Sequence, residues 1–138
     1  MPNLPFHHAF AVRDLTSTRV FYRDLLGCRE GRSTDTWVDF DFYGNQLSAH
    51  LGNPTQPTAT GHVDSVEVPI PHFGALLGWD DFQGVAARLA RAGIAFVIPP
   101  SVRYLGLLAE QATMFFLDPS GNAIELKALR NPAAAFGQ

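Results

Sequence analysis

The stretch Asp118-Pro119-Ser120-Gly121-Asn122-Ala123-Ile124-Glu125-Leu126 joins a tight turn to a short apolar strand that contains a carboxylate. Asp-Pro favours the start of a turn because proline presets φ at its second position, and Gly121-Asn122 tolerates left-handed backbone angles. Alternate side chains of a strand point to opposite faces, so Glu125 faces away from Ile124 and Leu126. Taken alone, this pattern is typical of a half-buried strand with Glu125 on its solvent face, because charged side chains are rarely buried unless paired.

The composition limits the class of protein. A chain of 138 residues with 46% hydrophobic residues is expected to form one domain, or two small halves that share one core. Its net charge of −3, with a single lysine, argues against nucleic acid as a partner. The single cysteine, Cys28, excludes an internal disulfide and a cysteine-rich zinc site, which agrees with a reducing cytosol.

Targeting and membrane signals are not evident in the sequence. The first residues contain no basic segment followed by an apolar run, and no stretch reaches the roughly 20 apolar residues that cross a bilayer. The sequence therefore predicts a soluble cytoplasmic protein without a membrane partner.

Two parts of the chain follow the same plan of strand, helix and further strands. Asp14 and Gly27 would begin and end the first helix, Asp80 and Gly93 the second, and each pair is 13 positions apart. A histidine precedes each helix on the first strand, and a Gly-Asn turn leads into each last strand: His7 and His72, Gly44-Asn45 and Gly121-Asn122. This repetition predicts an α+β fold whose strands pair into a curved sheet.

The remaining elements are expected as short strands and loops. Alternation predicts strands at 6–12, 37–42, 46–51, 95–98 and 113–117, with loops at 29–35 and 101–111 and a linker within 52–61. Pro99-Pro100 is expected to end the strand at 95–98.

Two histidines and a carboxylate take corresponding places in this plan. If the halves are related by a pseudo-twofold axis, His7 and His72 lie at equivalent positions, and Glu125 lies on a last strand. Two imidazoles and one carboxylate form a facial triad, which suits a divalent metal, commonly non-haem Fe(II), with positions left for substrate and O₂ or water. Two other interpretations remain open here: His7 as a hydrogen-bonded core histidine, and His72 as a loop residue beside Pro71.

Two motifs span most of the chain. The first is His7-His8-Ala9-Phe10-Ala11-Val12-Arg13-Asp14-Leu15 with Phe21-Tyr22-Arg23-Asp24-Leu25-Leu26-Gly27, and the second runs from Phe115 to Leu126. Together they resemble the opening and closing motifs of the vicinal oxygen chelate superfamily, which contains glyoxalase I, extradiol dioxygenases, fosfomycin-resistance proteins and bleomycin-binding proteins. The resemblance implies one domain of paired βαβββ modules that form a cupped mixed sheet around a metal. The modules would span about 5–53 and 63–128, with a linker at about 54–62 and a tail at 129–138.

The resemblance also implies the metal ligands, which are His7, His72 and Glu125. In glyoxalase I a fourth ligand, usually glutamate, lies on the last strand of the first module. Aligning residues 48–51 with 123–126 puts His50 at that place, whereas aligning the two Gly-Asn turns puts Ser48 there. Both alignments remain open from the sequence.

A further resemblance favours one reaction. The stretch Arg103-Tyr104-Leu105-Gly106, continued by residues 110–116, is similar to small proteins described as predicted extradiol dioxygenases. It implies ring cleavage of a catechol-type substrate with Fe(II), or with Zn, Ni or Mn in its place. Arg103 and Gln111 would bind the substrate, and Tyr104 and His50 would be the catalytic residues. His50 would act as acid–base because histidine titrates near working pH.

Other functions are retained as alternatives. They are a glyoxalase I-like lyase or isomerase, which Zn²⁺ or Ni²⁺ or a thiol cofactor would favour, and a protein that only binds a small molecule such as an antibiotic. In each case the expected partner is a small molecule, and the chain is expected to form a homodimer to which the tail from Asn131 contributes.

Overall fold

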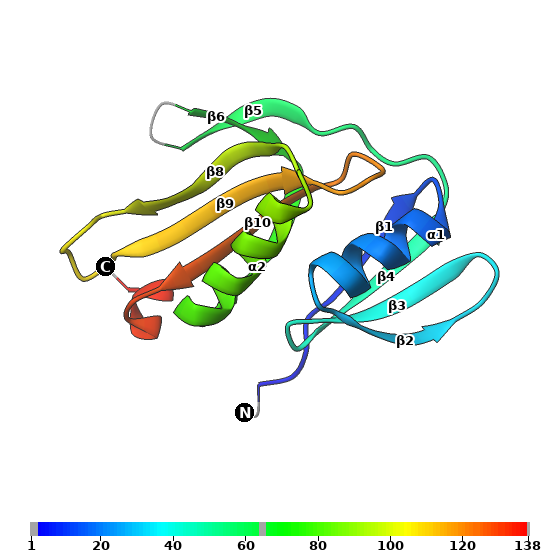
Figure 1. The fold of residues 1–138 in the computed structure, drawn as a ribbon, viewed down its shortest axis with the longest axis horizontal. Helices are drawn as coiled ribbons and strands as arrows, with labels where there is room; N and C mark the ends of the chain where they lie inside the picture. The colour runs from blue at the N-terminus through cyan, green and yellow to red at the C-terminus, as the bar shows by residue number, and fades with distance from the viewer. Residues whose placement is uncertain (1–2, 64–65, 138) are drawn as a thin grey trace. The chain divides into compact units, whose positions relative to one another are not determined.

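The computed structural model describes residues 3–63 and 66–137, and the order strand, helix, three strands occurs twice in it (Figure 1). The elements are β1 (His7–Val12), α1 (Leu15–Arg19), the π-helix η1 (Val20–Leu25), β2 (Arg29–Ser33), β3 (Trp37–Phe42), β4 (Asn45–Leu51), β5 (Thr58–Val63), β6 (Val66–Ile70), β7 (His72–Leu77), α2 (Trp79–Arg91), β8 (Phe96–Arg103), β9 (Gln111–Leu117), β10 (Ala123–Leu129) and the 3₁₀ helix η2 (Pro132–Ala135). The predicted α+β class and the paired βαβββ plan are confirmed.

The chain forms two compact units. The first contains the residues up to Gln56 together with Asp118–Asn122, and the second contains Pro57–Leu117 and the residues from Ala123 onward. The turn before β10 therefore belongs to the first unit, although strands of the second unit precede and follow it.

In the first unit, a four-stranded sheet of order β1-β4-β3-β2 packs against the helix formed by α1 and η1. β1 and β4 are parallel, and the other neighbours are antiparallel. Tyr22 of η1 is fully buried and stacks on Phe40 of β3, with ring centroids 5.3 Å apart. The other buried apolar strand residues are Val12, Val38, Phe42, Leu47 and Ala49. The sheet face away from the helix carries the alternate residues, which include His7, Ser48 and His50.

The first helix begins and ends as the sequence predicts. Asp14 is its N-cap, and its Oδ2 accepts a hydrogen bond from the backbone N–H of Ser17 (2.7 Å). Gly27 follows the helix with a φ of +75°, a conformation that glycine adopts without strain. The buried Thr18 donates its hydroxyl to the carbonyl of Asp14 (2.6 Å), and such bonds to the preceding turn often bend helices. The wider π-helical turn η1 follows directly.

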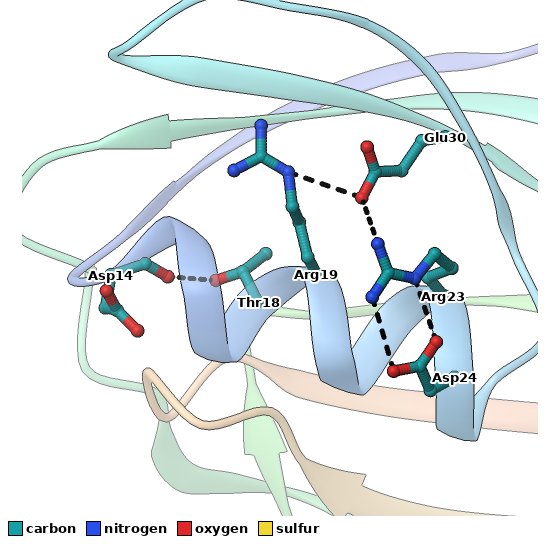
Figure 2. Close-up of polar contacts among 6 residues, drawn as sticks. All are labelled: Asp14, Thr18, Arg19, Arg23, Asp24 and Glu30. Atoms are coloured by element: carbon teal, nitrogen blue, oxygen red, sulfur yellow. Dashed lines mark hydrogen bonds and ion pairs between the residues drawn. The ribbon is translucent and has the colours of Figure 1, made fainter.

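Two arginines attach this helix to the edge strand β2 (Figure 2). Arg19 and Arg23 are four residues apart and therefore share one helix face. Both reach Oε1 of Glu30 on β2, at 3.3 Å and 3.2 Å, and Arg23 also donates to Asp24 (2.8 Å). Because these side chains are partly exposed, the contacts fix geometry more than they add stability.

In the second unit, a sheet of order β7-β10-β9-β8 packs against α2. β7 and β10 are parallel, which is the arrangement of β1 and β4 in the first unit. The buried residues Phe82, Val85 and Leu89 of α2 lie over the buried side chains Met114, Phe116, Ile124 and Leu126 of the sheet. A hairpin of β5 and β6 precedes β7 and pairs as a separate two-stranded sheet.

Several element boundaries differ from the sequence prediction. Residues 58–61, expected in the linker, are part of β5, and residues 29–33, expected in a loop, form β2. The N-cap of the second helix is Gly78, two residues before the expected Asp80. Pro99-Pro100 does not end a strand but lies within β8, which is an edge strand with register shifts on both sides of Ile98. An edge strand tolerates proline because one side of it needs no ladder hydrogen bonds.

The turn Asp118–Asn122 is held in the first unit by buried and partly buried hydrogen bonds. The Tyr22 hydroxyl donates to Oδ2 of Asp118 (2.8 Å), and the backbone N–H groups of Ser120 and Asn122 donate to Oδ1 (both 2.9 Å). Asn122 donates its amide to the carbonyl of Ala11 (2.9 Å). The backbone N–H of Arg13 donates to the Ser120 hydroxyl (2.9 Å). The turn is therefore attached both to the end of β1 and to the helix.

Replacing Tyr22 with phenylalanine is expected to lower the free energy of unfolding near neutral pH by about 1–3 kcal/mol, because Asp118 stays buried and loses a partner. Burial, together with the Asp118 charge, raises the pKa of Tyr22 well above its usual 10.0. Above about pH 10 the unfolded chain loses this proton while the folded chain keeps it, so wild-type stability falls as pH rises. The gap between wild type and variant should therefore shrink between pH 8 and pH 11 in urea unfolding.

The matched control is Tyr104→Phe, since the Tyr104 side chain is exposed. This variant should track the wild type at each pH. If the free energy of unfolding of Tyr22→Phe stays below that of the wild type by the same amount from pH 8 to pH 11, stability does not depend on the Tyr22 proton and the prediction is wrong.

Candidate metal-binding site

His72 and Glu125 lie together on the second unit's sheet, on the face away from α2. They come from the parallel neighbours β7 and β10, in a register that pairs His72 with Ala123 and Gly74 with Glu125. Nε2 of His72 is 3.5 Å from Oε1 of Glu125, and Glu125 is only 8% exposed. The solvent-face interpretation of Glu125 is therefore wrong, because this carboxylate is buried beside a histidine.

Each of these two side chains is oriented by a second partner. Nδ1 of His72 is 2.7 Å from the carbonyl oxygen of Pro69, which can only accept, so Nδ1 carries a proton. Nε2 is the nitrogen turned toward Glu125. The buried Thr113 donates its hydroxyl to Oε2 of Glu125 (2.6 Å), so the other carboxylate oxygen faces the histidine. Metal-binding histidines and carboxylates are oriented in this way by outer partners.

A glycine lets β7 approach β10 at this point. A Cβ built on Gly74 would overlap the backbone carbonyl of Glu125. Only glycine fits this place without displacing a strand. The close approach brings His72, which lies two residues earlier on β7, next to the side chain of Glu125. The imidazole also packs edge-to-face with Phe115, with ring centroids 4.9 Å apart.

An open hollow of about 340 Å³ surrounds this pair. Its lining residues are His72, Phe73, Gly74, Ala75, Leu76, Glu125 and Lys127. Nζ of Lys127 is 3.9 Å from Oε1 of Glu125, so a cation lies beside the carboxylate. The donor set of one imidazole nitrogen and one carboxylate oxygen, from two residues that line this hollow, suits a divalent metal such as Fe(II), Mn(II), Ni(II) or Zn(II).

The first unit carries a related arrangement on the corresponding sheet face. Nδ1 of His7 is 2.8 Å from Oε1 of Gln46, so His7 holds its proton on the same nitrogen as His72 when the amide oxygen accepts. The Ser48 hydroxyl donates to Oδ1 of Asp39 (2.5 Å). A carboxylate is therefore present on this face, but it comes from β3 and not from β4.

The strand register decides between Ser48 and His50 as the counterpart of Glu125. Ser48 pairs with Ala9, two residues after His7, just as Glu125 pairs with Gly74, two residues after His72. His50 lies one step further along the same face, is exposed, and has its ring 6.2 Å from that of Trp37. The alignment of the two Gly-Asn turns is therefore the correct one, and His50 is left available for a role other than that of the fourth ligand.

The other predicted substrate-binding residues lie farther along the second sheet. Arg103 of β8 pairs with Gln111 of β9, and both belong to the face that carries Glu125. Arg103 donates to the hydroxyl of the exposed Tyr104 (3.0 Å), and the Gln111 amide donates to the carbonyl of Ala109 (3.3 Å). Tyr104 has a φ of +56° at the start of the loop after β8.

The structure thus brings together some of the predicted site residues and adds others. His72 and Glu125 are adjacent in one unit, whereas His7, Ser48 and His50 belong to the other. Over residues 3–63 and 66–137, no three side chains of the His, Cys, Asp or Glu type form a group that could hold a metal. Sequence reasoning missed Thr113, Gly74 and Lys127. A glycine inside a strand was an available signal for close backbone approach.

The comparisons with known proteins identify the family. Residues 5–126 match the family model described as the Glyoxalase/Bleomycin resistance protein/Dioxygenase superfamily. The chain belongs to this superfamily, which confirms the resemblance stated from the sequence. A comparison with curated proteins gave no significant match.

Solved structures with the same fold include a glyoxalase/bleomycin resistance protein/dioxygenase from Alicyclobacillus acidocaldarius. It is 31% identical, the match covers 99% of this chain and 98% of that chain, and the TM-score is 0.76. The fosfomycin resistance protein FosX from Listeria monocytogenes is 19% identical, with 93% and 94% coverage and a TM-score of 0.68. A glyoxalase/dioxygenase from Nostoc punctiforme is 19% identical, with 91% and 90% coverage and a TM-score of 0.68. The latter two show the fold alone.

The helices were also compared with what a bilayer requires. Among the described residues, none of them is both long and apolar enough to cross a membrane.

Proposed function

We propose that this chain is a metal-dependent enzyme that binds a small molecule through two adjacent oxygen atoms and cleaves a catechol-type ring. The observation that carries the proposal is the buried pair of His72 and Glu125, in which the histidine proton is held on Nδ1 by Pro69 and Nε2 faces the carboxylate. A solvent-face carboxylate or a loop histidine would need neither the burial nor the orientation.

The residues divide into ligands and supporting groups. His72 and Glu125 would hold the metal, and His7 is the third ligand predicted from the sequence. A bound Fe(II) would supply a Lewis acid with open positions where a vicinal diol and O₂ meet. Thr113 would keep Glu125 in place, and the buried Phe115 would pack against the His72 ring and limit its movement. His50 is the residue predicted from the sequence to transfer a proton, since histidine titrates near working pH.

The proposed reaction breaks the ring bond beside a hydroxylated carbon and places both atoms of O₂ in the product. It therefore consumes one O₂ per diol and needs no added reductant. The test is oxygen uptake by anaerobically prepared, Fe(II)-loaded protein with a panel of catechols, alongside measurement of its metal content. We expect one equivalent of O₂ per diol and a yellow ring-opened product. Protein that keeps no metal, or iron-loaded protein inert to each diol, would refute the proposal.

A glyoxalase-like lyase or isomerase is the second candidate, and Lys127 favours it. An ammonium group 3.9 Å from the ligand carboxylate could stabilise an enediolate formed without oxygen. The same experiment separates the two candidates, because a lyase or isomerase converts its substrate without O₂ uptake.

A further inference from the structure

On the strands of the second sheet, cationic side chains outnumber carboxylates. Across β7, β8, β9 and β10, Glu125 is the one carboxylate, while Arg103 and Lys127 are cationic. Both cations share the face of Glu125, since Lys127 pairs with Thr113 and Arg103 pairs with Gln111 on β9. This face therefore has a positive excess, and a divalent metal bound to Glu125 would increase it.

Lys127 is placed to meet a ligand in the hollow. It lies two residues after Glu125 on β10 and lines the same hollow as His72 and Glu125. Its side chain is 38% exposed, so the ammonium is reachable from solvent. It is also the single lysine of an acidic chain.

An ordinary ion pair does not account for this position. The Lys127–Glu125 separation of 3.9 Å is longer than a hydrogen bond, and ion pairs of partly exposed side chains contribute little to stability. A lysine whose function is to neutralise Glu125 would compete with the metal for the carboxylate. A lysine that binds an anionic ligand beside the metal would not compete, because Glu125 then binds the metal and Lys127 binds the ligand.

We infer that the substrate carries an anionic group, and that Lys127 binds it. This inference rests on the proposed function, and it narrows the substrate to a diol acid. The Lys127 ammonium is 3.9 Å from Oε1 of Glu125, so a ligand that chelates a metal held by Glu125 would bring its other substituents close to this ammonium. An aromatic vicinal diol that carries a carboxylate on its ring or side chain would meet both groups. Arg103 adds positive potential farther along the face, although its guanidinium is already bonded to Tyr104.

The test compares an acid with a neutral ligand of similar size. Dissociation constants of 3,4-dihydroxyphenylacetate and 4-ethylcatechol are measured by calorimetry, without oxygen, on Fe(II)-loaded protein. Wild type should bind the acid more tightly. Lys127→Met should weaken the acid roughly tenfold to a hundredfold more than the neutral diol, as loss of one charge-assisted hydrogen bond does. Lys127→Arg should keep most of the preference.

The control for net charge is Arg91→Met, which removes a cation from an exposed position on α2. It should leave the preference for the acid unchanged. Equal binding of the two ligands by wild type, or equal weakening of both by Lys127→Met, would overturn the inference. The wild-type comparison involves no substitution, so equal binding of the two ligands would overturn the inference even if Lys127→Met does not fold.

Failure of the proposed function gives a different result. If the protein prefers the acid in a Lys127-dependent way but takes up no oxygen, the anion site stands and the proposed ring cleavage is refuted. If the protein cleaves both diols and binds them with equal affinity, the proposed ring cleavage stands and the anion site is refuted.

Discussion

Replacing Glu125 with glutamine is expected to reduce divalent-metal affinity by more than about 100-fold, since loss of an outer partner alone costs about 10–100-fold. Glutamine keeps the size of the side chain and can still accept from Thr113, so the fold should remain. What it removes is the negative charge 3.5 Å from Nε2 of His72. The measurement is metal content after dialysis, followed by competition with a chelator for Fe(II) and Zn(II).

Two further variants make this prediction sharper. Thr113→Val removes only the hydroxyl that orients Glu125 and should cause a smaller loss of affinity, within about 10–100-fold. Glu67→Gln makes the same change at an exposed position of β6 and should leave the affinity unchanged. Equal metal retention by wild type and Glu125→Gln would show that the buried carboxylate is only a structural partner of Thr113 and His72.

Replacing Gly74 with alanine is expected to lower the free energy of unfolding by about 3 kcal/mol, the upper part of the range for overpacked sites. The added Cβ would overlap the carbonyl of Glu125, and a carbonyl within a strand ladder cannot rotate away as a side chain can. β7 must then move from β10. Denaturant unfolding measures the loss, and metal affinity should fall with it because His72 moves together with β7.

The chain offers a matched control in Gly84→Ala. Gly84 lies within α2, and a Cβ there meets nothing within 4 Å. The same substitution should raise stability at this site by about 0.5–1 kcal/mol, because alanine is the better helix former. If Gly74→Ala also proved neutral or stabilising, the close approach of β7 and β10 would not be the constraint that the structure indicates.

The sequence predicted the parts of the fold that depend on local patterns. Asp14 and Gly27 delimit the first helix as expected, because capping and left-handed glycine conformations are properties of single residues. The strand boundaries at Pro99-Pro100 depend on whether a strand lies at a sheet edge, which local pattern does not reveal. The linker was predicted to include residues 58–61, which are in fact part of β5. These residues form a strand because they pair with β6, and local pattern does not reveal that pairing.

For the candidate site, the sequence predicted residue types but not their surroundings. Burial of Glu125 is a tertiary property, and so is the hydroxyl that Thr113 brings from the neighbouring strand. The choice between Ser48 and His50 required the pairing register, because both residues share a face and differ by one step. Lys127 is only the single lysine of the chain in the sequence, and its position beside Glu125 becomes evident in the structure.

The position of the turn Asp118–Asn122 has a consequence for how the chain is made. Tyr22 and Asp118 are 96 residues apart in sequence, yet their hydrogen bond is buried within one unit. During synthesis the first half emerges long before Asp118, so the Tyr22 hydroxyl has no native partner until most of the chain exists. The first unit therefore cannot form all its native contacts when its amino-terminal residues have been synthesised. The turn Asp118–Asn122, which is made later, supplies the missing contacts.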